Sequence, residues 1–169
     1  MAEITASLIK ELRDKSGAGV MECRRALEES GGDLNKALSV LREQGAAKAA
    51  KRSDRETSQG MVETYIHGGG RIGALVEINC ETDFVGRTED FKSLAHDIAM
   101  QIAATSPRYV AAEDVPAGEE GDVKEICLLE QAFIKDPGKT IKNLIDEAVA
   151  KTGEVVRVRR FARFELGGD

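Results

Sequence analysis

Residues 60–80 of the chain read GMVETYIHGGGRIGALVEINC, and this stretch decides the fold. Apolar and polar residues alternate from Met61 to His67 and again from Ile72 to Cys80, with three consecutive glycines between the two segments. Alternation with a period of two, interrupted by glycine, is typical of a β-hairpin. The pattern predicts two antiparallel strands. The side chains of the second strand that we expect to face the core are Ile72, Ala74, Val76, Ile78 and Cys80.

Helical periodicity follows the hairpin. Residues Glu89 to Thr105 carry a continuous apolar stripe that ends before Pro107, made of Phe91, Leu94, Ala95, Ile98, Ala99, Ile102 and Ala103. The stretch Val123 to Ile134 fits neither the helical nor the strand periodicity, and Pro137-Gly138 closes it. The apolar pattern from Thr140 to Lys151 predicts another helix. Residues 155–166 are rich in β-branched and aromatic side chains and predict a third strand. The fold class is α+β, with a three-stranded antiparallel sheet packed with helices.

The N-terminal part predicts a module of three short helices. Thr5 caps the first helix, which ends at Gly17 and Gly19. The second helix runs from Val20 to Glu29, with Met21, Ala26 and Leu27 facing inward, and the third follows Asp33 and ends at Gly45. Alanine and basic residues then predict a solvated linker helix. The expected domains are residues 1–45, a basic linker helix over 46–59, and an α+β core over 60–169.

Composition favours a protein partner over nucleic acid. The net charge is −6 and the pI is about 5.1, whereas a general grip on phosphates needs an excess of Lys and Arg. The cysteines Cys23, Cys80 and Cys127 are widely spaced and odd in number, as in reduced cytosolic proteins. The sequence has neither a secretory signal pattern nor an apolar run long enough to span a membrane, so we expect a cytoplasmic protein.

Signals for chemistry are sparse. The histidines, His67 and His96, lack a nucleophile at a motif spacing, and metal-ligand pairs are missing from the sequence. The glycines 68–70 lie between two strands and lack the Lys-Ser/Thr ending of a P-loop. We therefore expect a protein that is not an enzyme and needs no metal or cofactor. An enzyme that uses Cys80 with His67 is a remaining alternative.

A second alternative is an RNA-binding module built on the C-terminal strand. This strand carries Arg157, Arg159, Arg160 and Arg163, interleaved with Phe161 and Phe164. Arginines with stacking aromatics are found in RNA-binding surfaces. They are also found on ordinary sheets, where the arginines stay solvated and the phenylalanines enter the core. Because the net charge of the whole chain is negative, we favour the ordinary sheet over an RNA-binding surface.

The segment Asn79 to Arg87 falls where the second strand ends and before the long helix begins. We expect Asp83 and Phe84 at this corner, outside any regular element. A corner phenylalanine beside a carboxylate is either a local core plug with a cap or an anchor that fills a pocket on a partner.

Several blocks of the chain resemble the elongation factor Ts family. The resemblance rests on residues 4–13, 16–27, 45–51, 77–85 and 159–167. These blocks follow the order of the family and span nearly the whole chain, so the chain is identified as similar to its short bacterial members.

The resemblance implies a function and a set of contact residues. It implies a non-enzymatic guanine nucleotide exchange factor that binds the GTPase elongation factor Tu, both GDP-bound and nucleotide-free, and contacts no nucleotide or nucleic acid itself. The N-terminal module would be ubiquitin-associated-like and the core a dimerisation-type domain. The turn associated with dislodging the magnesium of the partner corresponds to Thr82, Asp83, Phe84 and Val85. The N-terminal contact surface corresponds to Arg13, Val20, Met21 and Arg24, where Val20 and Arg24 replace the Met and Lys of some relatives.

The chain also departs from the family pattern. It is shorter between Pro116 and Leu128, within the segment 117–138, and it lacks a second core repeat and a coiled-coil arm. Those parts contact the far domains of elongation factor Tu in long members, so this chain must do without such contacts or replace them. A homodimer is one replacement.

Overall fold

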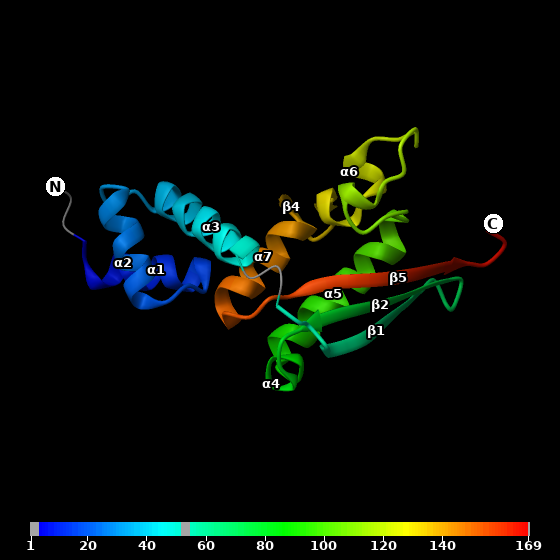
Figure 1. Ribbon diagram of the computed structural model, residues 1–169, viewed down its shortest axis with the longest axis horizontal. Coiled ribbons are helices and arrows are strands. Elements are labelled where there is room, and N and C mark those ends of the chain that lie inside the picture. The colour runs from blue at the N-terminus through cyan, green and yellow to red at the C-terminus, as the bar shows by residue number, and fades with distance from the viewer. Residues whose placement is uncertain (1–3, 52–54, 169) are drawn as a thin grey trace. The chain divides into compact units, whose positions relative to one another are not determined.

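The computed structural model describes residues 4–51 and 55–168 of the chain (Figure 1). Two compact units make up the protein: Met1–Arg55 with Asp146–Val155, and Glu56–Ile145 with Val156–Asp169. The α+β class is confirmed, since a helical N-terminal part precedes a three-stranded antiparallel sheet with helices. Residues 52–54 of the predicted linker lie outside the described residues.

The first two helices of the first unit begin and end where the sequence predicts. In α1 (Ala6–Ser16), the hydroxyl of Thr5 accepts a hydrogen bond from the Leu8 amide at 3.3 Å, and Gly17 ends the helix with a φ of 68°. Helix α2 (Val20–Glu29) has the predicted bounds. The prediction that Met21 faces inward is wrong, because its side chain is 58% exposed. Met21 lies in the first turn of the helix, on the side opposite the buried residues.

The third helix is longer than predicted. Asp33 caps α3 (Leu34–Lys51), and its carboxylate accepts from the amides of Asn35 at 2.9 Å and Lys36 at 3.1 Å. The helix continues through Gly45, so the predicted end at that glycine and the separate linker helix are wrong. A glycine inside a helix costs only about 1 kcal/mol, and the alanine-rich residues that follow it favour the helix.

The core of the helical module is small and apolar. Its fully buried members are Leu12, Cys23, Ala26, Leu27 and Ala37, with Ala18 and Leu41 nearly so. Partly buried residues such as Leu8 and Leu38 pack around them.

The sheet of the second unit has the strand order β1-β2-β5, all antiparallel, with bounds Gln59–His67, Ile72–Cys80 and Arg157–Glu165. Glycines 68–70 make the predicted hairpin turn, and all three have positive φ angles, which glycine adopts without a Cβ clash. A bulge in β5 interrupts the pairing with β2 between Glu77 and Ile78.

Helix α5 (Glu89–Thr105) has the predicted bounds and lies along one face of this sheet (Figure 1). Val76, Ile78 and Cys80 are completely buried beneath it, as predicted from the alternation on β2. The opposite face of the sheet carries large exposed apolar side chains: Val62, Ile66, Leu75 and Phe164.

Short elements join α5 to the last helix. They are η1 (Ala112–Asp114), α6 (Val123–Ile126), η2 (Leu128–Glu130), β3 (Ala132–Phe133) and β4 (Asp136–Thr140), and the last helix is α7 (Ile141–Thr152). The ambiguous stretch Val123 to Ile134 thus contains a helical turn, a 3-10 turn and a short strand. Pro137 and Gly138 lie inside β4 and do not close the segment, because β4 pairs only with the two residues of β3 and tolerates them at an edge.

Candidate functional site

A single helical turn follows the end of β2. Helix α4 (Asp83–Gly86) begins at Thr82, whose hydroxyl accepts from the Val85 amide at 3.4 Å. The expectation that Asp83 and Phe84 lie outside any regular element is therefore wrong. The cap closes a complete turn, and it presents residues 83 and 84 on the outer side.

The turn is fastened to the sheet from below. Val85 is only 7% exposed, and the Cys80 thiol donates to the carbonyl of Thr82 at 3.1 Å. A Cβ placed on Gly86 would lie 3.3 Å from the Cα of Gly60 on β1, so the two backbones approach closely. Contacts of this kind fix the direction in which the outer side chains of α4 project.

The turn is also fastened at its C-terminal end. The hydroxyl of Thr88 donates to the Val85 carbonyl at 2.8 Å, and the same oxygen accepts from the Phe91 amide in the first turn of α5. One side chain therefore closes α4 and caps α5. Since α5 is packed on the sheet, the turn has little freedom to move.

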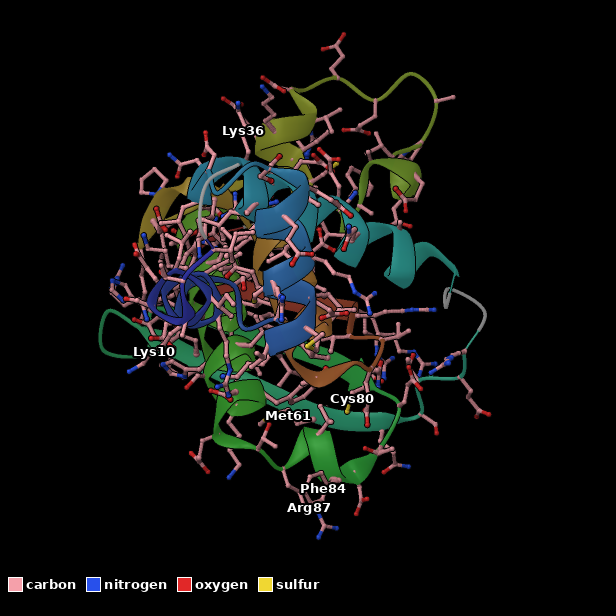
Figure 2. The ribbon with its side chains drawn as sticks, turned by 90° about the vertical axis from the view of Figure 1, so that its left-hand side faces the viewer. Lys10, Lys36, Met61, Cys80, Phe84 and Arg87 are labelled. Carbon is pink, nitrogen blue, oxygen red and sulfur yellow. The ribbon has the colours of Figure 1, made fainter. Side chains whose placement is uncertain are left out.

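Phe84 projects from this turn into solvent. Its side chain is 80% exposed, the largest exposed fraction among the exposed large apolar residues of the described chain. Figure 2 shows Phe84 and Arg87 at the outer edge of the molecule, whereas Cys80 lies further in, toward the strands. The reading of Phe84 as a local core plug is thus wrong, and the ring is free to enter a pocket on another molecule.

Asp83 and Arg87 form an ion pair across the turn. The Oδ2 atom of Asp83 lies 3.0 Å from Nη2 of Arg87, and both side chains are largely exposed. The Arg87 amide also donates to the Asp83 carbonyl at 3.1 Å. Backbone and side chains therefore both bridge these residues around Phe84.

The predicted N-terminal contact residues all lie on the surface of the helical module. Val20 and Met21 occupy the first turn of α2 and are 50% and 58% exposed. Arg24, one turn further on, pairs with Glu28 at 3.0 Å, and Arg13 is exposed near the end of α1. Two neighbouring exposed apolar side chains with an arginine one turn away are typical of surfaces that bind another protein.

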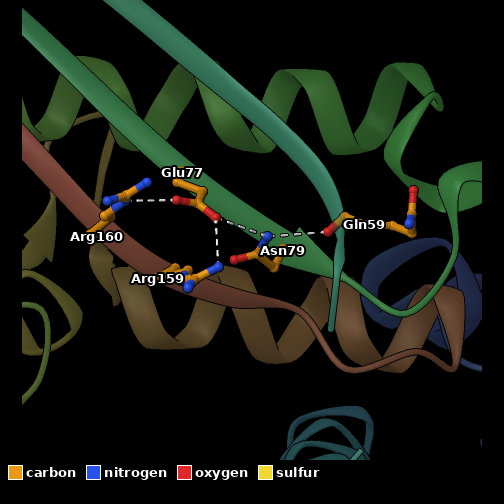
Figure 3. A network of polar contacts seen from close by, with 5 residues as sticks. All are labelled: Gln59, Glu77, Asn79, Arg159 and Arg160. Carbon is orange, nitrogen blue, oxygen red and sulfur yellow. Dashed lines mark hydrogen bonds and ion pairs between the residues drawn. The ribbon is translucent and has the colours of Figure 1, made fainter. Parts of the chain in front are cut away.

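Three arginines of β5, namely Arg159, Arg160 and Arg163, donate hydrogen bonds within the chain. Because of the bulge, Arg159 and Arg160 both reach Glu77, at 3.3 Å and 2.8 Å (Figure 3). The hydrogen bond from Arg160 lowers the pKa of the Glu77 carboxyl, and Asn79 adds to this effect. Arg163 donates to the carbonyl of Ala103 at 3.1 Å. Glu77 therefore pairs with both Arg159 and Arg160, whose side chains stay 66% and 78% exposed, as expected for solvated arginines on an ordinary sheet.

The alternative of an enzyme built on Cys80 and His67 is wrong. In the hairpin, His67 lies opposite Ile72, eight residues along β2 from Cys80. At about 3.3 Å per residue the two side chains are roughly 25 Å apart. His67 instead lies 3.4 Å from the Tyr65 hydroxyl, and His96 packs edge-on against the same ring.

The described residues offer neither a metal cluster nor a membrane-spanning helix. Among residues 4–51 and 55–168, no group of three or more His, Cys, Asp or Glu side chains is placed to bind a metal ion. Within the same ranges, the helices are too short or too polar to cross a bilayer.

The fold and site define a class: an α+β protein with a helical module, whose distinctive features are exposed apolar side chains on α2 and α4. The family model described as Elongation factor TS matches residues 28–120 and 119–168. The chain belongs to the elongation factor Ts family, and its role is in translation elongation.

The chain is similar to curated proteins along nearly its whole length. It is 52% identical to the elongation factor Ts of Carboxydothermus hydrogenoformans, with 97% of this chain and 89% of the relative covered. It is 52% identical to that of Desulforamulus reducens, with 99% and 91% covered. It is 49% identical to that of Desulfosudis oleivorans, with 99% and 100% covered.

These comparisons also show that the chain is shorter than its relatives within the aligned region. The alignment with the Carboxydothermus hydrogenoformans protein is 194 positions long, whereas this chain has 169 residues. At least 25 positions of that relative therefore have no counterpart in this chain. The two matched parts of the family model meet at residues 119–120, in the loop between η1 and α6. Arg108 holds this loop, since its guanidinium contacts the Glu119 carboxylate and donates to the Glu120 carbonyl at 2.6 Å.

Proposed function

We propose that the protein is the guanine nucleotide exchange factor of elongation factor Tu, and that it promotes GDP release by disturbing the magnesium site of that GTPase. The observation that carries the proposal is the exposed Phe84 on a turn fastened at both ends. Family membership supplies the partner. The protein acts in the cytoplasm, and it is neither an enzyme nor a binder of nucleotide, nucleic acid or membrane.

An exposed ring on a rigid turn is an efficient anchor. Burying a phenylalanine side chain stabilises a complex by about 2–3 kcal/mol. Since Val85 and Gly86 are packed on the sheet, little conformational entropy is lost when the ring docks. Most of the free energy of burial is therefore available to displace elements of the partner.

The displacement acts on GDP through charge. In GTPases, Mg²⁺ and backbone amides neutralise the phosphates of the nucleotide. A ring that wedges between helices near this site shifts the metal ligands and weakens GDP without touching it. Asp83, beside the ring, engages the opened surface and need not bind the metal. Linkage requires reciprocity, so bound GDP weakens the affinity of the factor by the same ratio.

The helical module supplies a second, separate contact. Val20 and Met21 are apolar, adjacent and exposed on α2, with Arg24 one turn away. We assign these residues and Arg13 to binding the GTPase domain, which keeps the wedge in register. Two linked contacts bind more tightly than either one alone, because the second forms at a high effective concentration.

A second copy of the chain covers the open face of the sheet in this proposal. Val62, Ile66, Leu75 and Phe164 are exposed apolar side chains on that face, which also carries the Glu77–Arg160 ion pair. Large exposed apolar patches mark interaction sites. A twofold homodimer would pair this face of one copy with the same face of the other. The second copy would then replace some of the contact surface that longer family members build from additional segments.

The test is stimulated release of a fluorescent GDP from elongation factor Tu, followed by stopped flow. The wild-type protein is expected to accelerate release, and Phe84→Ala to lose at least about tenfold of this stimulation. Leu166→Ala removes an apolar side chain of similar exposure in the same unit and serves as the control. Circular dichroism checks that both variants fold. Full stimulation by a folded Phe84→Ala variant would end the wedge hypothesis.

A further inference from the structure

We infer that Arg87 is a positioning residue of the exchange reaction: it is the counter-ion that allows Asp83 to enter the interface beside Phe84. The inference rests on the proposed function, because it assumes that the turn docks into a partner. It starts from the ion pair between Asp83 and Arg87 at 3.0 Å across α4.

The charges around the turn single out Arg87. Residues 81–90 read ETDFVGRTED, with four carboxylates, and Arg87 is the only basic residue among them. Further along α5, Lys92 is engaged with Glu89 at 2.7 Å. Arg87 is therefore the cation that the chain itself provides next to the ring.

In the free protein this pair contributes little to stability. The Asp83 side chain is 60% exposed and that of Arg87 is 81% exposed, so water solvates both charges. Exposed pairs of this kind have small energies, and salt screens them. The Val85 and Gly86 contacts hold the turn without help from the pair.

Docking changes the environment of the pair. When Phe84 enters a partner, the residues on either side of it in α4 lose much of their water. A carboxylate left without a counter-ion in such a site is strongly unfavourable, whereas a pair that stays together is tolerated. Arg87 therefore matters little for folding and much for the docked state.

The geometry allows the pair to travel as a unit. The contact joins Nη2 of Arg87 to Oδ2 of Asp83, and the residues are spaced i,i+4 on the turn. A lysine at position 87 can make the same single contact. The role therefore depends on the positive charge and not on a bidentate guanidinium.

Four variants test the inference in the stimulated GDP release assay: Arg87→Gln, Arg87→Lys, Asp83→Asn, and the double variant Asp83→Asn with Arg87→Gln. We expect Arg87→Gln to lower the ratio of maximal rate to half-saturating concentration about tenfold, and Arg87→Lys to restore most of it. The thermal midpoint of Arg87→Gln should differ from that of the wild type by no more than about 3 °C. In the Asp83→Asn background, Arg87→Gln should have little further effect.

The control is Lys135→Gln, which removes another ion pair of the same unit, between Lys135 and Asp97 at 2.6 Å, and should leave release unchanged. Wild-type stimulation by Arg87→Gln, or an equal loss from Arg87→Gln in both backgrounds, would overturn the counter-ion role while leaving the exchange function intact. Failure of the wild-type protein itself to stimulate release would instead contradict the proposed function.

Discussion

Glu77 on β2 lies opposite Arg160 on β5, and Nε of the arginine donates to Oε2 of the glutamate at 2.8 Å (Figure 3). The bulge in β5 brings Arg159 to the other carboxylate oxygen, and Asn79 joins the cluster while also donating to the Gln59 carbonyl. Only 16% of the Glu77 side chain is exposed. One acidic residue on the central strand thus links both edge strands.

This cluster predicts an acid-sensitive component of stability. The hydrogen bond from Arg160 lowers the pKa of Glu77 from its ordinary 4.5, so the folded state favours the ionised form. The resulting stabilisation is complete above the ordinary pKa and is lost as the pH falls through the lowered pKa. We expect the thermal midpoint of Glu77→Gln to fall less than that of the wild type between about pH 6 and pH 3, measured by circular dichroism.

Glu113→Gln is the control for this measurement, since Glu113 is exposed in the same unit. It should follow the wild-type pH profile. Parallel profiles for Glu77→Gln and the wild type would mean that the cluster contributes no pH-dependent stability.

Gly60 predicts a large loss of stability on substitution. Its φ is 136°, and a Cβ at this position would lie 2.0 Å from the carbonyl oxygen of Ile78 on the neighbouring strand. Gly60→Ala should reduce the free energy of unfolding by about 3 kcal/mol or more, measured by urea denaturation. Gly69→Ala, at a positive φ with open space around it, should cost only about 1 kcal/mol. Similar losses for the two variants would show that β1 can shift away from β2 at Gly60.

The helical module predicts a separation of binding from folding. Met21→Glu places a charge on an exposed apolar position of α2, so we expect a stability change within about 0.5 kcal/mol. Binding to elongation factor Tu should weaken about tenfold, measured by isothermal titration calorimetry. Ser39→Glu adds the same charge to an exposed position of α3 as the control. Equal binding by both variants would remove Met21 from the contact surface.

The open face of the sheet predicts a concentration-dependent homodimer. Phe164→Glu places a charge among the exposed apolar residues of that face, and it should raise the dissociation constant of the dimer by at least about tenfold in sedimentation experiments. Val123→Glu alters another exposed apolar residue of the unit, on α6, and should leave the dimer unchanged. A wild-type protein that stays monomeric over the tested range would refute the dimer.

Elements with local signals were predictable from residue patterns. Helices α2 and α5 have the predicted bounds, because their caps and periodicity involve residues within a few positions of each other. The hairpin followed in the same way from its alternation and its glycines. Local signals failed at Gly45, where a glycine that commonly ends helices lies inside α3, because neighbouring alanines offset its cost.

The residues that make up the candidate site could be named from sequence, but their presentation could not. Met21 fitted the inward face of a helical pattern and is exposed, while Phe84 was equally compatible with a core plug. Arg159 and Arg160 read as free charges until the bulge placed both on Glu77. Exposure and charge pairing depend on residues far away in the chain, which no short pattern reports.

The amino-acid sequence by itself determined the α+β class, the bounds of the helices with strong caps, and the family to which the chain belongs. All three depend on patterns of residues that are close together in the chain. Only the tertiary structure decided that Phe84 stands in solvent, that Val85 and Gly86 hold its turn against the sheet, and that Arg87 lies against Asp83. The physical reason is that burial and ion pairing are sums over neighbours in space, and the packing of α4 between β1, β2 and α5 selects those neighbours.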